Sequence, residues 1–144
     1  MYEIGKLVAR IHEASHKWLM SELTSIGLKS LAPSHGDILA YLFEHGEATM
    51  HELAQFAHRT KSTMTVLVDK MVQLGIVTKE KSTLDSRSQI VRLTKYGESL
   101  QGAFNDISRR YIAFMYSGVC DKDAIAVERI LSKILSNVQK ENAE

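Results

Sequence analysis

Cysteine is almost absent from this sequence: Cys120 is the only one, so no disulfide can form within the chain. The sequence also has no apolar run of the roughly 18 residues that a membrane-spanning helix needs. Its first residues lack the apolar segment of a secretion signal. These absences predict a protein that works in the reducing cytoplasm and does not enter a membrane.

Motifs of the common enzyme active sites are missing as well. The chain has no glycine-rich phosphate loop, no G-x-S-x-G and no H-E-x-x-H. His12 and His16 have the i, i+4 spacing with which two imidazoles share a metal, but no cysteine or second histidine pair completes a tetrahedral set. We therefore expect no enzyme activity, no metal site and no resident cofactor.

The chain has the size and composition of one globular domain. Its 144 residues are 44% hydrophobic, which is enough to bury a core. The net charge is only +1, but residues 59–95 carry eight basic side chains against three acidic ones. A basic segment in an otherwise slightly acidic chain is typical of a face that binds nucleic acid. An ordinary solvated surface is the alternative interpretation of the same charges.

Apolar residues at helical spacing predict a first helix over residues 3–23. A second helix is expected to begin at Pro33, because the N–H that proline lacks would have no partner in a first turn anyway. Ser34 and Asp37 offer a second way to cap this start. The helix is expected to end at Gly46, which suits a C-terminal stop.

A capping box follows, in which Thr49 can accept from the backbone N–H of Glu52 while the Glu52 carboxylate reaches back. It predicts a short third helix, from Met50 to Ala57. Thr60 is then in position to cap a fourth helix that ends at Gly75. Two helices joined by a turn of about three residues are typical of a helix-turn-helix.

β-Branched residues next mark two strands, 76–81 and 89–93. The polar connection between them contains Asp85, Ser86 and Arg87. The pattern predicts a β-hairpin, or wing, placed directly after the helix-turn-helix.

Two further helices are expected in the rest of the chain. Thr94 is in position to cap a long one that runs to Gly118, and Asp121 to cap the last. Both resemble the first helix in being strongly apolar on one side, more than a small winged core can cover. This predicts a homodimer held by these helices, with a monomeric helical subdomain as the alternative.

In this order of elements the chain resembles the MarR family of bacterial transcriptional regulators. Residues 53–77 look like the family's helix-turn-helix through the glycine that ends its recognition helix. The run D-S-R at 85–87 is similar to the family's D-x-R wing tip, and L-T-K-Y-G at 93–97 is similar to its L-T-x-x-G entry to the next helix.

The chain departs from the family pattern at two places. His58 and Arg59 stand in the turn where the family usually has glycine and an apolar residue, which predicts a looser and more basic turn. Val66 stands on the recognition helix where a basic residue is common. These departures bear on how bases are read and leave the expected fold unchanged.

The resemblance implies a mainly α fold with a small β-wing. A winged helix-turn-helix lobe is expected at residues 33–97, flanked by long helical dimerisation regions at 1–32 and 98–144, all within a single domain over 1–144. The partners it implies are a second copy of the chain and a pseudo-palindromic site in double-stranded DNA.

The residues expected to contact DNA lie on the exposed face of the recognition helix and at the wing tip: Lys61, Ser62, Thr63, Thr65, Val66, Lys70, Asp85 and Arg87. The first turns of a recognition helix enter the major groove deepest. Ser62 and Thr65 are therefore candidate base readers or phosphate donors, and Val66 is placed to touch a thymine methyl. Lys61 is expected to reach a phosphate or a guanine.

The wing tip is expected to enter the neighbouring minor groove. Narrow A·T-rich DNA concentrates negative potential there, which favours an inserted Arg87. Asp85 is expected to pair with Arg87 or another nearby arginine and so fix the geometry of the tip. The alternative is an exposed ion pair worth about 0–1 kcal/mol.

His12, His16 and His35 are grouped as candidate effector-binding residues. The resemblance implies a cavity between the dimer helices and the winged core that receives small aromatic or anionic effectors. Cys120 is expected to be incidental, because no resolving cysteine accompanies it.

The sequence therefore predicts a homodimeric, winged-helix transcriptional regulator, with a ligand-responsive repressor as the expected form. A winged-helix protein-interaction module that does not bind DNA is the alternative, since fold alone does not fix function.

Overall fold

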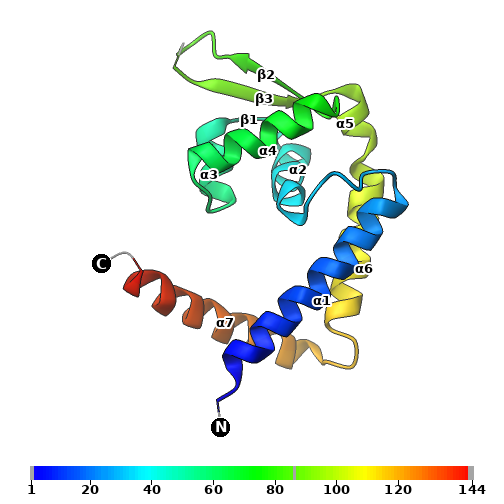
Figure 1. Cartoon of the computed structure of the whole chain (residues 1–144), viewed down its shortest axis with the longest axis vertical. Coiled ribbons are helices and arrows are strands. Elements are labelled where there is room, and N and C mark those ends of the chain that lie inside the picture. Colours follow the sequence, from blue (N-terminus) through cyan, green and yellow to red (C-terminus); the bar gives the residue numbers. More distant parts are fainter. Residues whose placement is uncertain (1, 86, 143–144) are drawn as a thin grey trace. The chain divides into compact units, whose positions relative to one another are not determined.

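The computed structural model describes residues 2–85 and 87–142 (Figure 1). Ser86, which the sequence places in the wing connection, lies outside the described residues. The chain divides into two compact units, Met1–Ser108 and Arg109–Glu144. None of the described helices is both long enough and apolar enough to cross a membrane.

Helices dominate the order of elements, and most of them follow the sequence pattern. The first unit contains α1 (Ile4–Ser25), α2 (Pro33–His45), β1 (Glu47–Thr49), α3 (Met50–Phe56), α4 (Lys61–Gln73), β2 (Val77–Lys81), β3 (Gln89–Leu93), α5 (Lys95–Ser99) and the start of α6 (Gln101–Met115). The second unit contains the end of α6 and α7 (Asp121–Glu141). The predicted mainly α fold with a β-wing is confirmed.

The sheet has one strand more than the sequence predicted. Its antiparallel order is β1-β3-β2, so β3 pairs on both sides: Val91 lies opposite Ala48 of β1 and Lys79 of β2. Only three residues form β1, and two of them, Glu47 and Ala48, are of types depleted in strands. This strand forms because the outer edge of β3 offers it hydrogen bonds, which is a property of the folded sheet.

The core lies where α2, α3 and α4 meet the sheet, in the upper part of Figure 1. Its members come from the predicted apolar stripes and from the middle of β3, and they are fully buried: Leu39, Leu42, Leu53, Met64, Val68, Met71 and Val91. Packing of these side chains, at about 1.5–3 kcal/mol for each one fully buried, is what holds the short helices in place.

Three predicted N-caps are confirmed. Thr49 Oγ1 accepts from the N–H of Glu52 at 3.1 Å, while Glu52 Oε2 accepts from the N–H of Thr49 at 2.9 Å. Thr60 Oγ1 accepts from the N–H of Thr63 at 3.2 Å. Thr94 caps α5 in the same way. Each cap satisfies a first-turn N–H that otherwise has no intrahelical partner.

Three expectations about helix ends are wrong. The N-cap of α2 is Ala32, and neither Ser34 nor Asp37 caps that start. The N-cap of α7 is Cys120, so Asp121 is the first helical residue and lies where its charge favours the helix dipole. The long helix expected after Thr94 is interrupted at Leu100, whose N–H bonds to the Gly97 carbonyl three residues back at 3.1 Å, so that α5 and α6 are separate.

Ile76, between α4 and the wing, is the point at which α4, β2 and α5 are joined. Its carbonyl accepts from Thr94 N at 3.0 Å. The Thr94 hydroxyl has a single proton, which lies between the Gly75 carbonyl at 2.5 Å and the Ile76 carbonyl at 3.1 Å. A Cβ placed on Gly97 would lie 2.1 Å from the Ile76 oxygen, so only glycine allows α5 to approach this closely.

We expect Gly97→Ala to destabilise the protein by about 1–3 kcal/mol, because an added methyl overlaps backbone that cannot move without breaking the Thr94 hydrogen bonds. Gly102→Ala is the matched control, since nothing lies within 4 Å of its Cβ position in α6. Replacing a helical glycine by alanine is neutral or stabilises by up to about 1 kcal/mol. Urea denaturation measures both changes, and equal midpoints for the two variants would contradict this account of the junction.

Candidate nucleic-acid interface

The turn between α3 and α4 is closed by a complete set of C-terminal hydrogen bonds. His58 N donates to the Gln55 carbonyl at 3.3 Å, and Arg59 N donates to the Ala54 carbonyl at 3.0 Å. His58 has φ of 52°, the left-handed conformation that this motif requires. The turn is therefore well defined and not looser, although a residue with a Cβ costs roughly 1–2 kcal/mol more than glycine in this conformation.

The helix that follows the turn divides into two faces. Met64, Val68 and Met71 of α4 are buried in the core. The opposite face carries the predicted DNA-contacting residues, of which Lys61, Ser62, Thr63 and Val66 are exposed and Thr65 and Lys70 are half-buried. Val66 is 70% exposed, far more than a core valine, so it is available to an apolar group of a partner.

The hydroxyl groups at the start of α4 already make local hydrogen bonds. Thr60 Oγ1 lies 3.2 Å from Ser62 Oγ and 3.0 Å from Thr63 Oγ1. Thr65 Oγ1 donates to the Lys61 carbonyl at 2.9 Å. Because this bond uses the single hydroxyl proton of Thr65, its remaining capacity is to accept, which suits a base amino group better than a phosphate oxygen.

The wing tip is held by a different contact from the predicted ion pair. Asp85 Oδ1 accepts from the backbone N–H of Arg87 at 3.0 Å, and Ser88 N donates to the Asp85 carbonyl at 3.0 Å. Among the described residues no ion pair joins the Asp85 and Arg87 side chains. The carboxylate therefore shapes the tip through the backbone, and the Arg87 guanidinium stays available.

Two of the basic residues in the segment 59–95 are used inside the fold. Arg92 of β3 bonds to Glu47 of β1 at 2.5 Å and to Glu80 of β2 at 3.1 Å, which ties the three strands together on their exposed face. Lys79 of β2 bonds to Asp69 of α4 at 2.6 Å and joins the wing to the recognition helix. Exposed pairs of this kind contribute little to stability because solvent screens them, so their effect is chiefly on position.

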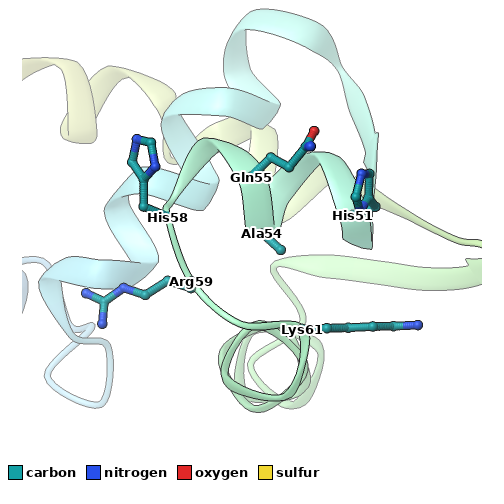
Figure 2. A pocket seen from close by; sticks show the side chains of 6 residues that line it. All are labelled: His51, Ala54, Gln55, His58, Arg59 and Lys61. Carbon is teal, nitrogen blue, oxygen red and sulfur yellow. The ribbon is translucent and has the colours of Figure 1, made fainter. Parts of the chain in front are cut away.

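A first surface hollow lies over the turn, with a volume of about 550 Å³. Its lining residues are His51, Ala54, Gln55, His58, Arg59 and Lys61. Figure 2 shows Arg59 and Lys61 extending to opposite sides of the start of α4. Cations that diverge in this way suit an extended partner better than one small anion. Arg59 also acts on Asp37 of α2: burial raises the pKa of the Asp37 carboxyl, and the positive charge of Arg59 partly lowers it again.

A second hollow, of about 380 Å³, lies between the helix-turn-helix and the wing. Its lining residues are Met50, His51, Lys61, Lys81, Asp85, Arg87, Ser88 and Gln89. It brings together the predicted Lys61, Asp85 and Arg87 with His51 and Lys81, which the sequence interpretation did not select. Lys81 could have been selected from the sequence, because it stands in the basic segment 59–95. No feature of the sequence pointed to His51.

The three candidate effector histidines are not in equivalent places. His12 and His16 are exposed neighbours on α1, with ring centroids 6.2 Å apart. His35 is buried, with only 5% of its surface exposed, and its Nδ1 accepts from the N–H of Ala32 at 2.9 Å. None of the three lines either hollow described above. His35 is thus an internal cap for the start of α2, and its grouping with His12 and His16 has no support in this geometry.

Comparison with known proteins identifies the region that contains this surface. Residues 31–89 match the model of the MarR family. The chain is 24% identical over 134 residues to YpoP, described as an HTH-type transcriptional regulator of Bacillus subtilis, and the match covers 93% of this chain and 92% of that protein. It is 26% identical over 102 residues to IacR, an HTH-type transcriptional repressor of Pseudomonas putida, covering 71% and 61%.

Solved structures match over nearly the whole chain. The MepR–DNA complex of S. aureus superposes with a TM-score of 0.84 at 20% identity, covering 95% of this chain and 99% of that one. A mutant MarR from E. coli complexed with operator DNA superposes with a TM-score of 0.80 at 17% identity, covering 92% and 93%. At these identities the matches establish the fold.

We expect the buried His35 to make stability depend on pH. Burial lowers the pKa of His35 below its ordinary value of 6.5, and the charge of Lys70 acts in the same direction. Below about pH 6.5 the unfolded chain therefore binds a proton that the folded chain does not, so the free energy of unfolding decreases as the pH is lowered through that range. His35→Gln keeps an acceptor for the Ala32 N–H and should flatten this fall. Urea denaturation between pH 7.5 and 5 measures it, and an unchanged slope in the variant would exclude His35 as the cause.

Proposed function

Since residues 31–89 match the MarR family and the whole chain has the fold of solved MarR family regulators, we propose that this protein is a sequence-specific, double-stranded DNA-binding transcriptional regulator. In this proposal residues 33–97 are the DNA-binding lobe, and the regions 1–32 and 98–144 form a homodimer. The protein acts as a repressor in the cytoplasm, where it binds a pseudo-palindromic operator.

One observation carries the proposal: Lys61 at the start of α4 and Arg87 at the wing tip line the same hollow. A helix in the major groove and a slim wing in the neighbouring minor groove contact DNA from one side only if their cations share a face. The MepR and mutant MarR structures, which share this fold, are complexes with DNA.

Apolar side chains on the helices outside the winged lobe support the homodimer. Ile4, Leu7, Val8 and Ile11 of α1 are each more than 40% exposed, and so are Ile125, Ile130, Leu131, Leu135 and Val138 of α7. Stripes of this size on a single chain are typical of an interface. A two-fold dimer also matches a two-fold operator, with recognition helices about 34–36 Å apart, which is one turn of DNA.

Regulation by a small aromatic or anionic effector stays a prediction. His12 and His16 of α1 remain its candidate contacts, now without His35. A ligand at such a site would change operator affinity only through its different affinities for the DNA-binding and non-binding arrangements of the dimer.

We expect the protein to be a dimer in solution at micromolar concentration, as measured by light scattering. Leu131→Lys should weaken the dimer, because it places a charge in the middle of the apolar stripe of α7. Lys133→Glu, two residues further along the exposed helix, is the control. This variant should form particles of the same mass as the wild-type protein. A monomeric wild-type protein would rule out the two-fold operator model.

We expect Arg87→Ala to weaken binding to operator DNA by about 1–3 kcal/mol and to reduce its salt dependence, since a cation that meets the DNA is lost. The test uses a duplex selected by the wild-type protein from a random-sequence pool, with affinity measured over a salt series. A protein-interaction module would show no salt-dependent binding to any duplex, and that result would favour the alternative function.

We expect Asp85→Ala also to weaken binding, although it removes a negative charge, because the tip loses the acceptor for the Arg87 N–H. Asp85→Asn is the matched control: it keeps the acceptor oxygen, removes the charge and should bind at least as tightly as the wild type. If Asp85→Ala bound as tightly as Asp85→Asn, bulk charge and not tip geometry would be the role of this residue.

A further inference from the structure

Five basic residues of the wing and α4 fall into two groups, and Lys70 of α4 lines neither hollow. Lys79 and Arg92 are paired with carboxylates and hold the wing to α4 and the strands to one another. In the part of the chain that the structure describes, no ion pair involves Lys61, Lys81 or Arg87. All three of these unpaired cations line the hollow between the helix-turn-helix and the wing.

Elements far apart in the sequence supply the walls of this hollow. Lys61 comes from the start of α4, His51 from the first turn of α3, and Lys81 from the end of β2. Gln89, paired opposite Lys81 in the sheet, adds an amide donor. The carboxylate in the hollow is that of Asp85, one oxygen of which already accepts from the Arg87 N–H. The remaining donors point to an oxyanion as the occupant.

Geometry identifies which oxyanion, on the premise of the proposed function. If α4 lies in a major groove and the wing in the neighbouring minor groove, the sugar-phosphate strand that separates those grooves must pass between them. The hollow lies between the start of α4 and the wing. That strand therefore meets the protein at this hollow, and its negative phosphates come close to Lys61, Lys81 and Arg87.

We propose that this hollow seats one backbone phosphate of the DNA strand between the two grooves, held by Lys61, Lys81 and His51. A phosphate contact carries no sequence information, but it fixes the register and depth of the elements on either side of it. This seat couples the recognition helix to the wing: it sets how far Arg87 enters the minor groove when Ser62, Thr65 and Val66 meet base edges.

The test compares Lys81→Gln with Lys17→Gln, which removes the same charge from the exposed surface of α1, outside the winged lobe. Losing one phosphate contact should lower the slope of log affinity against log salt by about 0.9. We expect this change for Lys81→Gln on the selected duplex, with about a five- to tenfold loss of affinity at low salt. Lys81→Arg should restore binding, and thermal unfolding checks that each variant folds.

Duplexes with a single uncharged methylphosphonate locate the contact. At one backbone position between the grooves, the substitution should weaken wild-type binding and have little further effect on Lys81→Gln. His51→Gln should show the same coupling at the same position. Additive losses of affinity at every backbone position, or equal salt slopes for Lys81→Gln and Lys17→Gln, would overturn the proposed phosphate contact. DNA binding by the chain would still stand.

Two other results are separable from these. Saturable binding of inorganic phosphate that Lys81→Gln abolishes, with an unchanged salt slope on DNA, would assign the hollow to a free anion and overturn the DNA-phosphate assignment. Failure of the wild-type protein to bind any duplex would overturn the proposed function, and the seat with it.

Discussion

The carbonyl of Ile76 is the constraint on which the surface of this protein depends. Ile76 lies between α4 and β2, and its carbonyl accepts from the N–H of Thr94, whose hydroxyl lies 3.1 Å away. Gly97 lets α5 approach this oxygen more closely than any side chain permits. These contacts hold α4, the wing and α5 in fixed relative positions.

Charge on this protein has two separate tasks. Arg92 and Lys79 pair with carboxylates on neighbouring elements, so they shape the sheet and its attachment to α4. Lys61, Lys81 and Arg87 line the hollow beside them. Among the described residues these three form no ion pair, so their charges contribute more to the field that an approaching polyanion meets than those of Arg92 and Lys79 do. A simple count of basic residues in the segment overstates that field.

The turn of the helix-turn-helix contains one residue, His58, with a strained backbone conformation. His58 adopts a left-handed conformation that glycine adopts more easily, and the hydrogen bonds of Arg59 and His58 to α3 hold it there. His35 is a second polar residue whose role depends on its place in the fold. A histidine that resembled a ligand contact in the sequence satisfies the Ala32 N–H and packs in the interior. Both residues are polar, and their surroundings in the fold decide what each one does.

The sequence by itself determined most of the helices, the caps at Thr49, Thr60 and Thr94, the wing strands and the exposed face of α4. These follow from apolar periodicity and from hydrogen bonds that span three residues, so a short window of sequence contains their cause. The tertiary structure alone decided the third strand, β1, because its partner β3 lies more than 40 residues away in the chain. It also decided which cations form ion pairs and which hollow His51 and Lys81 share, since a pairing or a shared hollow depends on distances that only the folded chain sets.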